Sequence, residues 1–105
     1  MAGVLHSVII KRLAQTNNAM PVRLSAHAKK RMRERSIHAR DVEGVLHNPI
    51  EVIETKYARR AALGRLSTGG KFVLVVFEVS GEGFIVVTAI KIDGDRARRY
   101  GFTRV

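Results

Sequence analysis

The sequence predicts an α+β domain, in which helices from the first half of the chain pack on one face of a four-stranded antiparallel sheet formed by the second half. Up to residue 47, apolar residues recur with a helical period. From residue 50 onward, short runs rich in Val, Ile and Phe alternate with glycine-containing turns, which is typical of antiparallel strands. Because both helices would cover the same face, we expect the other face of the sheet to be partly open.

The length of 105 residues fits a single domain. We expect that domain to span residues 20–105 and to follow an amphipathic helical extension at residues 1–19. Within this extension, residues 3–14 carry apolar side chains at helical spacing, with Lys11 and Arg12 on the other side. The apolar stripe would either pack on the domain or form a homodimer contact between two copies of the chain.

The central helix is expected at residues 24–35, with Ser25 as its N-cap because a short hydroxyl can accept from the free N–H groups of the first turn. At about 100° per residue, Arg35 falls in the middle of the inward face, with Arg31 and His27 along one edge. A buried guanidinium is costly unless it is paired, so this position indicates a partner. Alternatively, Arg35 is a cation that suits the helix C-terminus, and His27 is an ordinary first-turn residue.

A second helix is expected at residues 39–47, with His38 and His47 at its ends. Strands follow in order, and the third is apolar enough to be covered on both faces. Their expected ranges are 50–56, 60–67, 72–77 and 84–92. Residues 95–105 are short, polar and dense in arginine. Polar side chains along the strands are candidates for the open face: Glu54, Lys56, Arg65, Glu78, Thr88 and Lys91.

The chain carries 19 Lys and Arg against 9 Asp and Glu, a formal net charge of +10. A small domain this basic usually has a polyanionic partner. Nucleic acid is the leading candidate and an acidic protein the second, while a charge that serves solubility alone is the alternative. The excess of arginine over lysine favours planar, bidentate contacts to phosphate or carboxylate groups.

Several classes of protein are excluded. The chain has no cysteine, which excludes disulfides, a thiol nucleophile and thiolate zinc sites and fits a reducing cytoplasm. No apolar run is long enough to span a membrane, and the N-terminus does not fit a signal peptide. No glycine-rich phosphate loop, His-Glu-x-x-His motif or carboxylate cluster occurs, so we expect neither a metal ion nor a cofactor.

Metal-free cleavage of RNA is a reaction for which the chain has the residue types. RNA supplies its own nucleophile, the 2′-hydroxyl, so an enzyme needs a proton acceptor, a proton donor and cations that stabilise the transition state. His27, Tyr100, Lys91 and the arginines could provide them. The same residue types also suit a protein that binds RNA without cutting it.

Aromatic residues lie among basic ones at two places. Tyr100 and Phe102, near the chain end, could stack on bases or could close the core. The run Lys56-Tyr57-Ala58-Arg59-Arg60 is expected in a loop between the first two strands, where it could touch phosphate.

The helical half carries the pattern Leu24-Ser-x-His-Ala-x-x-Arg-Met-x-x-Arg35, followed by Asp41-Val-Glu-x-Val-Leu46 and Pro49. With Gly64-Arg65 and Arg99-Tyr100, it resembles a widespread family of small bacterial proteins catalogued as a domain of unknown function, over about residues 21–104. The order of elements is also similar to that of the RelE/BrnT toxins. That wider resemblance, an analogy at the level of fold, implies a metal-independent mRNA endonuclease with a cognate antitoxin.

The toxin resemblance implies Arg65, Arg99 and Tyr100 as candidates for transition-state stabilisation and acid–base catalysis. The helix motif adds His27 and Arg31. Our hypothesis is that His27 is the general base or acid, while Arg31 and Arg65 hold the scissile phosphate. Further contacts to nucleic acid are expected from six basic residues: Arg35, Lys56, Lys91, Arg96, Arg98 and Arg104.

The function expected from the sequence is therefore an endoribonuclease toxin of a type II toxin–antitoxin system. It would act in the cytoplasm on RNA, either free or bound to the ribosome, and would have an acidic antitoxin as its partner. The alternative is a non-catalytic module that binds RNA or DNA through the same basic surface. A third interpretation is a structural protein that docks an acidic partner through its arginines.

Overall fold

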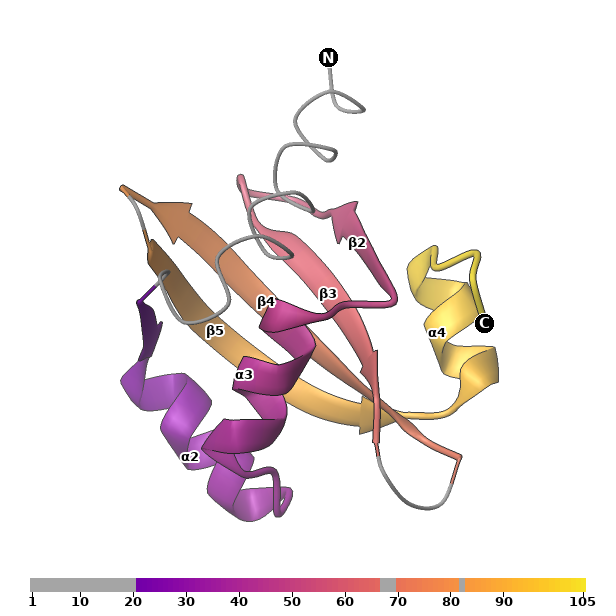
Figure 1. Cartoon of the computed structure of the whole chain (residues 1–105), viewed down its shortest axis with the longest axis horizontal. Coiled ribbons are helices and arrows are strands. Elements are labelled where there is room, and N and C mark those ends of the chain that lie inside the picture. The colour runs from indigo at the N-terminus through magenta and orange to yellow at the C-terminus, as the bar shows by residue number, and fades with distance from the viewer. Residues whose placement is uncertain (1–20, 67–69, 82) are drawn as a thin grey trace.

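The computed structural model describes residues 21–66, 70–81 and 83–105 (Figure 1). The extension expected at residues 1–19, and the dimer contact expected from residues 3–14, lie outside the described residues. In chain order the elements are β1 (Val22–Leu24), α2 (Ala26–Glu34), α3 (Ala39–His47), β2 (Glu51–Glu54), β3 (Arg60–Arg65), β4 (Phe72–Ser80), β5 (Gly83–Ile92) and α4 (Gly94–Tyr100).

The predicted α+β class is confirmed, but the sheet has five strands, in the order β1-β5-β4-β3-β2. Strands β2 to β5 form the expected antiparallel meander. Strand β1 pairs in parallel with β5, where the sequence predicts only an extended lead-in to the first helix. The expected count of four strands is wrong because three residues are too few to show the alternation that predicts a strand.

Helices α2 and α3 cover one face of the sheet, which we call the helix face (Figure 1). The hydroxyl of Ser25 accepts a hydrogen bond from the N–H of Ala28 at 3.0 Å and caps α2, as predicted. Ala28 and Met32 of α2 are buried in a core that α3 completes with Val42, Val45 and Leu46. On the strands, this core includes Val52, Ala62, Val73, Val75, Phe77, Phe84, Val86 and Ala89.

Helix α4 packs on the opposite face of the sheet, where no helix was expected. The carboxylate of Asp93 caps it by accepting from the N–H of Arg96 at 2.8 Å, and Gly101 ends it with a φ of 112°. Ala97 is the one buried residue of α4, so the sequence shows no apolar period there. Ala97 and Phe102 pack on Phe72, Leu74 and Ile92.

Phe102 is 2% exposed and belongs to this second core, so the interpretation of Phe102 as a base-stacking platform is wrong. The chain end is fixed beyond it. One oxygen of the Glu51 carboxylate accepts from the backbone N–H groups of Thr103 at 2.8 Å and Arg104 at 2.9 Å. Because α4 covers only part of its face, we call this side the open face.

The strand register shows which polar residues reach the open face. Arg65 lies opposite Phe72, Thr88 opposite Val76, and Glu78 opposite Ile85. These three expected residues belong to the open face, because neighbours across a register share a face.

Two expected open-face residues lie elsewhere. Lys91 lies opposite Val73, and Glu54 opposite Arg60, which places both on the helix face. Thr88 and Lys91 were both expected on the open face, but residues three apart in one strand point to opposite faces. Lys56 follows β2, in the turn that leads to β3.

No helix within the described ranges is both long and apolar enough to cross a membrane.

Candidate functional site

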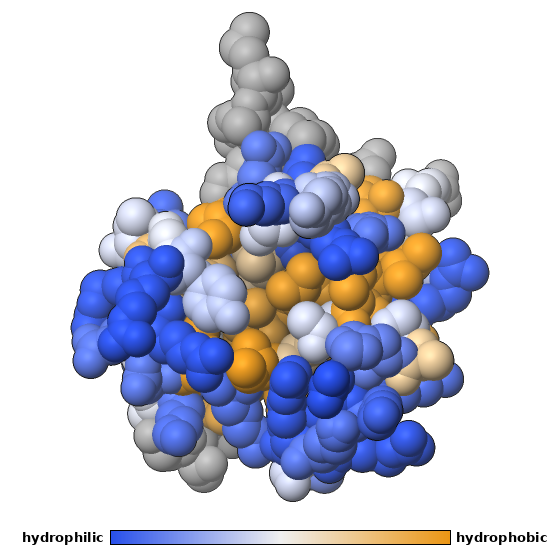
Figure 2. All heavy atoms as spheres, turned by 180° about the vertical axis from the view of Figure 1, so that it is seen from behind, coloured by the Kyte–Doolittle hydropathy of each residue, from blue (hydrophilic) through white to orange (hydrophobic). Residues whose placement is uncertain are grey.

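The open face combines an apolar centre with a basic rim. Figure 2 shows apolar side chains in the middle of this side of the molecule and hydrophilic side chains around them. Ile53, Val76 and Ile90 are only partly buried here, because α4 leaves them uncovered. Aliphatic surface beside cations suits a ligand with flat bases and charged phosphates.

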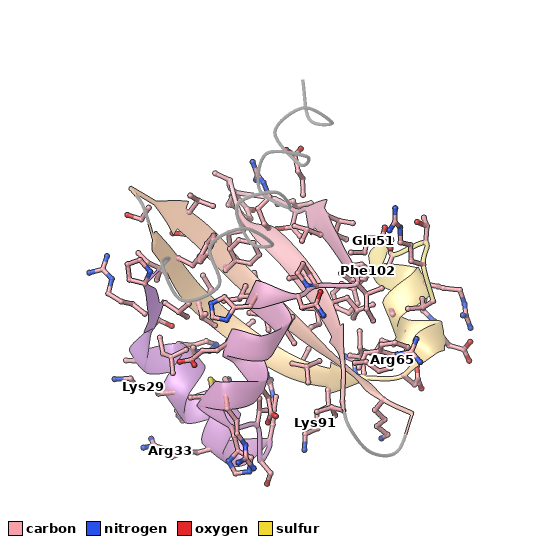
Figure 3. All side chains as sticks on the ribbon, viewed as in Figure 1. Lys29, Arg33, Glu51, Arg65, Lys91 and Phe102 are labelled. Carbon is pink, nitrogen blue, oxygen red and sulfur yellow. The ribbon has the colours of Figure 1, made fainter. Side chains whose placement is uncertain are left out.

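Arg65 ends β3 on this face. Its guanidinium carbon lies 5.5 Å from the centre of the Phe72 ring, a cation–π arrangement that orients the side chain. Figure 3 shows Arg65 beside α4. The side chain is exposed, so its charge is available to a phosphate.

A hollow of about 390 Å³ lies on this side of the molecule. We call it the tyrosine hollow; its lining residues are Glu54, Thr55, Lys56, Tyr57, Arg59, Val76 and Tyr100. The β2–β3 turn, β4 and α4 therefore meet here. Two tyrosines, one lysine and one arginine are among the residues that line this one hollow.

An ion pair beside the tyrosine hollow fixes Arg59. Its Nε donates to Oε1 of Glu78 at 3.1 Å, and both side chains are about 40% exposed (41% and 40%). Within the described residues, the terminal nitrogens of Arg59 and Oε2 of Glu78 have no hydrogen-bond partner. The pair therefore presents an oriented cation and a free carboxylate oxygen at the same place on the open face.

The basic residues of α4 point in different directions. Tyr100 lines the tyrosine hollow and is 46% exposed. Arg99 is about 200° around the helix from the buried Ala97, so it points to solvent and away from the sheet. Arg96 and Arg98 are exposed on the two flanks, and Arg98 pairs with Asp95.

Arg65 and Tyr100 share the open face but do not converge on one atom. The start of α4 lies near Phe72, since a Cβ on Gly94 would be 3.9 Å from its ring, and Tyr100 ends the helix. Seven residues of helix span about 10 Å. These two residues are therefore placed to contact successive parts of one strand.

His27 and Arg31 lie on α2, on the other side of the sheet. His27 is exposed, and Nη1 of Arg31 is paired with Glu34 at 3.2 Å. Figure 3 shows Lys29 and Arg33 of the same helix pointing outward, far from Arg65. The structure does not bring Arg31 and Arg65 together, so the hypothesis that both hold one phosphate lacks geometric support.

Arg35 reaches the open face from α2, across the outer edge of β5. Its Nη1 donates to the carbonyl of Ala89 at 2.7 Å and to the hydroxyl of Thr88 at 3.4 Å. The partner that the sequence indicated for Arg35 is therefore within the chain. Its guanidinium also adds charge to the rim of the open face.

The other residues predicted to contact nucleic acid lie in different parts of the structure. Lys56 lines the tyrosine hollow. Lys91 is half-buried at the edge of the helix face, and Arg104 is exposed beyond α4, near Glu51.

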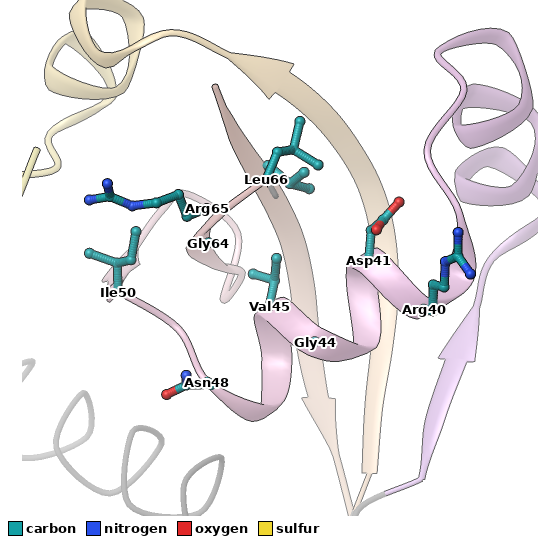
Figure 4. A pocket seen from close by; sticks show the side chains of 10 residues that line it. Arg40, Asp41, Gly44, Val45, Asn48, Ile50, Gly64, Arg65 and Leu66 are labelled. Carbon is teal, nitrogen blue, oxygen red and sulfur yellow. The ribbon is translucent and has the colours of Figure 1, made fainter. Parts of the chain in front are cut away.

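A second hollow, of about 360 Å³, lies between α3 and the end of β3. Arg40, Asp41 and Asn48 are among its lining residues, and Arg65 also borders it. Figure 4 shows the Arg65 side chain pointing away from Arg40 and Asp41. This hollow contains no aromatic side chain, so it lacks the features that suit a base.

In the described part of the chain, no group of three or more histidine or acidic side chains could hold a metal ion. His38 and His47 stand at the two ends of α3, as predicted, and the backbone N–H of His38 donates to Oδ2 of Asp41 at 3.0 Å. The chemistry available on the open face is therefore that of Arg, Lys, Tyr and Glu side chains.

Three residues of this site were not among the predicted site residues: Tyr57, Arg59 and Glu78. The sequence offered a signal for two of them, since Tyr57 and Arg59 belong to the basic–aromatic run at residues 56–60. Glu78 was expected on the open face, but its pairing with Arg59 joins residues 19 apart in sequence. Only the hairpin that pairs β3 with β4 brings them together.

The fold is similar to that of the crystal structure of the Brucella abortus ribonuclease toxin BrnT, with a TM-score of 0.56. The two proteins are 19% identical, over 71% of this chain and 99% of that one, so the likeness concerns the fold alone. No curated protein matches the chain.

Residues 24–91 match the family model of a domain of unknown function, DUF4258. The match is shorter than the expected range of 21–104 and ends before α4. The predicted resemblance to such a family is confirmed, while the significance of its His-Ala-x-x-Arg-Met helix stays a prediction. Because the matched residues are more than half of the chain, the protein belongs to the DUF4258 family.

Proposed function

We propose that this protein binds single-stranded RNA across the open face and cleaves it without a metal ion, as the toxin of a toxin–antitoxin pair in the cytoplasm. The observation that carries the proposal is the tyrosine hollow, which Tyr100, Lys56 and Arg59 line, together with the ion pair between Arg59 and Glu78. The toxin-like fold supports the proposal.

The open face has a group for each step of a metal-free transesterification. Glu78 takes the proton from the ribose 2′-hydroxyl, and the 2′-oxygen attacks phosphorus. The bond from phosphorus to the 5′-oxygen breaks, and that oxygen takes a proton from the Tyr100 hydroxyl. Lys56 and Arg59 stabilise the additional negative charge on the phosphoryl oxygens. The products are a 2′,3′-cyclic phosphate and a 5′-hydroxyl.

Arg65 and Arg99 have supporting roles in this proposal. Arg65 lies about one helix length from Tyr100, so it binds a neighbouring phosphate of the same strand. Arg99 faces solvent and adds charge that attracts the RNA. The antitoxin would be an acidic protein that covers the same basic rim.

The test is to incubate the purified protein with RNA in the presence of a chelator and to map the new ends. Cleavage that leaves cyclic phosphate and 5′-hydroxyl ends is expected for wild type. We expect Glu78→Gln and Tyr100→Phe to lose cleavage by at least 100-fold, the usual scale of acid–base catalysis, while they still bind RNA. Loss in His27→Ala, with full activity in Glu78→Gln, would instead assign the chemistry to α2.

A second candidate function is RNA binding without catalysis. It is favoured by one observation: among the described residues, His27, His38 and His47 all lie on α2, on α3 or at their ends, so none is on the open face. Retained binding with intact RNA under all conditions would establish this candidate in place of the toxin.

A further inference from the structure

We propose that Tyr57 is a stacking platform for one unpaired base of the RNA, with Lys56 and Arg59 on the adjoining phosphates. This inference rests on the proposed function in one respect, the identity of the nucleic acid as RNA. It adds a subsite for one base of the strand.

Exposure is the first observation. Tyr57 is 84% exposed, whereas the other large apolar side chains that stand out, Val79 and Tyr100, are 39% and 46% exposed. A tyrosine ring in water contributes little to folding, because its apolar area is not buried. Tyr57 is also one of the residues that line the tyrosine hollow, beside Lys56 and Arg59.

Backbone conformation is the second observation. Tyr57 has a φ of 62° and Ala58 a φ of 58°, both in the left-handed region. Tight turns whose two central residues both have positive φ usually carry Asn-Gly, because bulky side chains are strained there. The chain therefore holds a large aromatic side chain at a position that favours Asn, and such strain is typical of functional positions.

The neighbouring charges support stacking. Arg59 is oriented by Glu78, and Lys56 has no side-chain partner among the described residues, so both can bind phosphate. Val76 adds an aliphatic surface inside the hollow. A nucleotide held by its phosphate on these cations would have its base against a tyrosine ring, the combination by which proteins hold single strands.

The composition of the chain makes the test direct. It has two tyrosines and no tryptophan, and both tyrosines line the tyrosine hollow. In a Tyr100→Phe protein, all tyrosine fluorescence therefore comes from Tyr57. A stacked base quenches that fluorescence, whereas a phosphate bound nearby leaves the ring in water.

The experiment titrates Tyr100→Phe with a short single-stranded 2′-O-methyl oligonucleotide, which has no 2′-hydroxyl and cannot be cleaved. The matched probe is the same backbone with abasic positions. We expect quenching with the first probe and none with the abasic one. Equal responses to both probes, or no quenching at a concentration where binding is complete, would overturn the proposal.

A binding measurement on Tyr57→Asn completes the test. Asn suits a positive φ, so this variant removes the ring without weakening the turn. We expect roughly 5- to 150-fold weaker binding of the oligonucleotide, the effect of removing one stacking ring. Lys29→Ala on α2 is the control, with unchanged affinity, and Tyr57→Asn with wild-type affinity would refute the subsite.

The two proposals fail in different ways. The probe carries no nucleophile, so quenching and affinity report the subsite even when the protein has no ribonuclease activity. Conversely, cleavage of RNA with full efficiency by Tyr57→Asn, without loss of affinity, would leave the proposed function intact and remove the stacking platform.

Discussion

Gly64 sets how closely α3 can approach the sheet. A Cβ at this position would lie 2.4 Å from Cγ2 of Val45, closer than real Cβ contacts. Gly64 lies on β3 opposite Val73, beneath α3, so the contact occurs inside the main core. Only a residue without a side chain allows the helix and the strand to meet.

We therefore expect Gly64→Ala to lower the free energy of unfolding by about 1–3 kcal/mol, the usual effect of overpacking a core. Gly44→Ala is the matched control, because Gly44 is exposed in α3 with nothing within 4 Å of the new Cβ. The control is expected to gain up to about 1 kcal/mol from helix propensity. Urea unfolding of both variants measures the difference, and equal stabilities would contradict this account of Gly64.

Arg35 is expected to act first as a structural residue. Removing its side chain in Arg35→Ala leaves the carbonyl of Ala89 on the β5 edge without its donor. We expect a loss of about 1–3 kcal/mol, the scale of a hydrogen bond that involves a charged group. Arg33→Ala, an exposed position on the same helix, is expected to change stability by less than about 0.5 kcal/mol.

Thermal or urea unfolding distinguishes these two arginine variants. If Arg35→Ala is as stable as wild type yet binds RNA less tightly, the guanidinium serves the ligand and the observed hydrogen bonds contribute nothing to folding.

At the level of secondary-structure elements, the end of α4 and the residues after it have two different roles: Phe102 packs in the core, and Tyr100 lines the candidate site. Phe102 is buried under the helix, whereas Tyr100 is about half exposed beside the tyrosine hollow. We expect Phe102→Ala to lose about 3–5 kcal/mol of stability. Tyr100→Ala should lose less stability than Phe102→Ala, because the Tyr100 ring is about half exposed, and should lose about 1–3 kcal/mol of RNA binding. Calorimetry and a binding titration check the pair, and the reverse pattern would exchange the two roles.

The sequence predicted those helices and strands in which apolar residues recur regularly over enough positions to show a helical or strand period. The second helix matches its expected range at residues 39–47, and the Ser25 cap begins α2. Strand β1 and helix α4 were missed because three residues, or one buried alanine among arginines, form no period.

The site was less predictable than the fold. Tyr100 and Lys56 were predicted as site residues and line the tyrosine hollow. Arg31 and Arg65 were expected to hold one phosphate, but they lie on opposite sides of the sheet. The helical period predicts the direction in which a side chain points from the helix axis. It does not predict which face of the sheet the helix will cover. The Arg59–Glu78 pair depends on strand register, which sequence alternation alone does not determine.

At the scale of the whole molecule, the net charge of +10 predicts binding that weakens steeply with salt. Each cation on a phosphate of a single strand adds about 0.7 to the slope of log affinity against log salt. We expect Arg59→Ala and Arg65→Ala each to reduce the slope by about 0.7. Tyr57→Asn should lower affinity at every salt concentration with no change in slope.

Titrations of these three variants over a range of salt concentrations test this division between charge and stacking. A smaller slope in Tyr57→Asn, or an unchanged slope in both arginine variants, would show that phosphate contacts lie elsewhere on the protein.

RNA is proposed to lie on the open face and not on α2. The most direct measurement is the change in backbone amide NMR shifts when a non-cleavable 2′-O-methyl RNA is added to the labelled protein. We expect the largest changes at Tyr57, Arg59, Arg65 and Tyr100, with small ones at His27 and Lys29. Large changes along α2, with the open face unaffected, would contradict the account and place the ligand on the opposite side of the sheet.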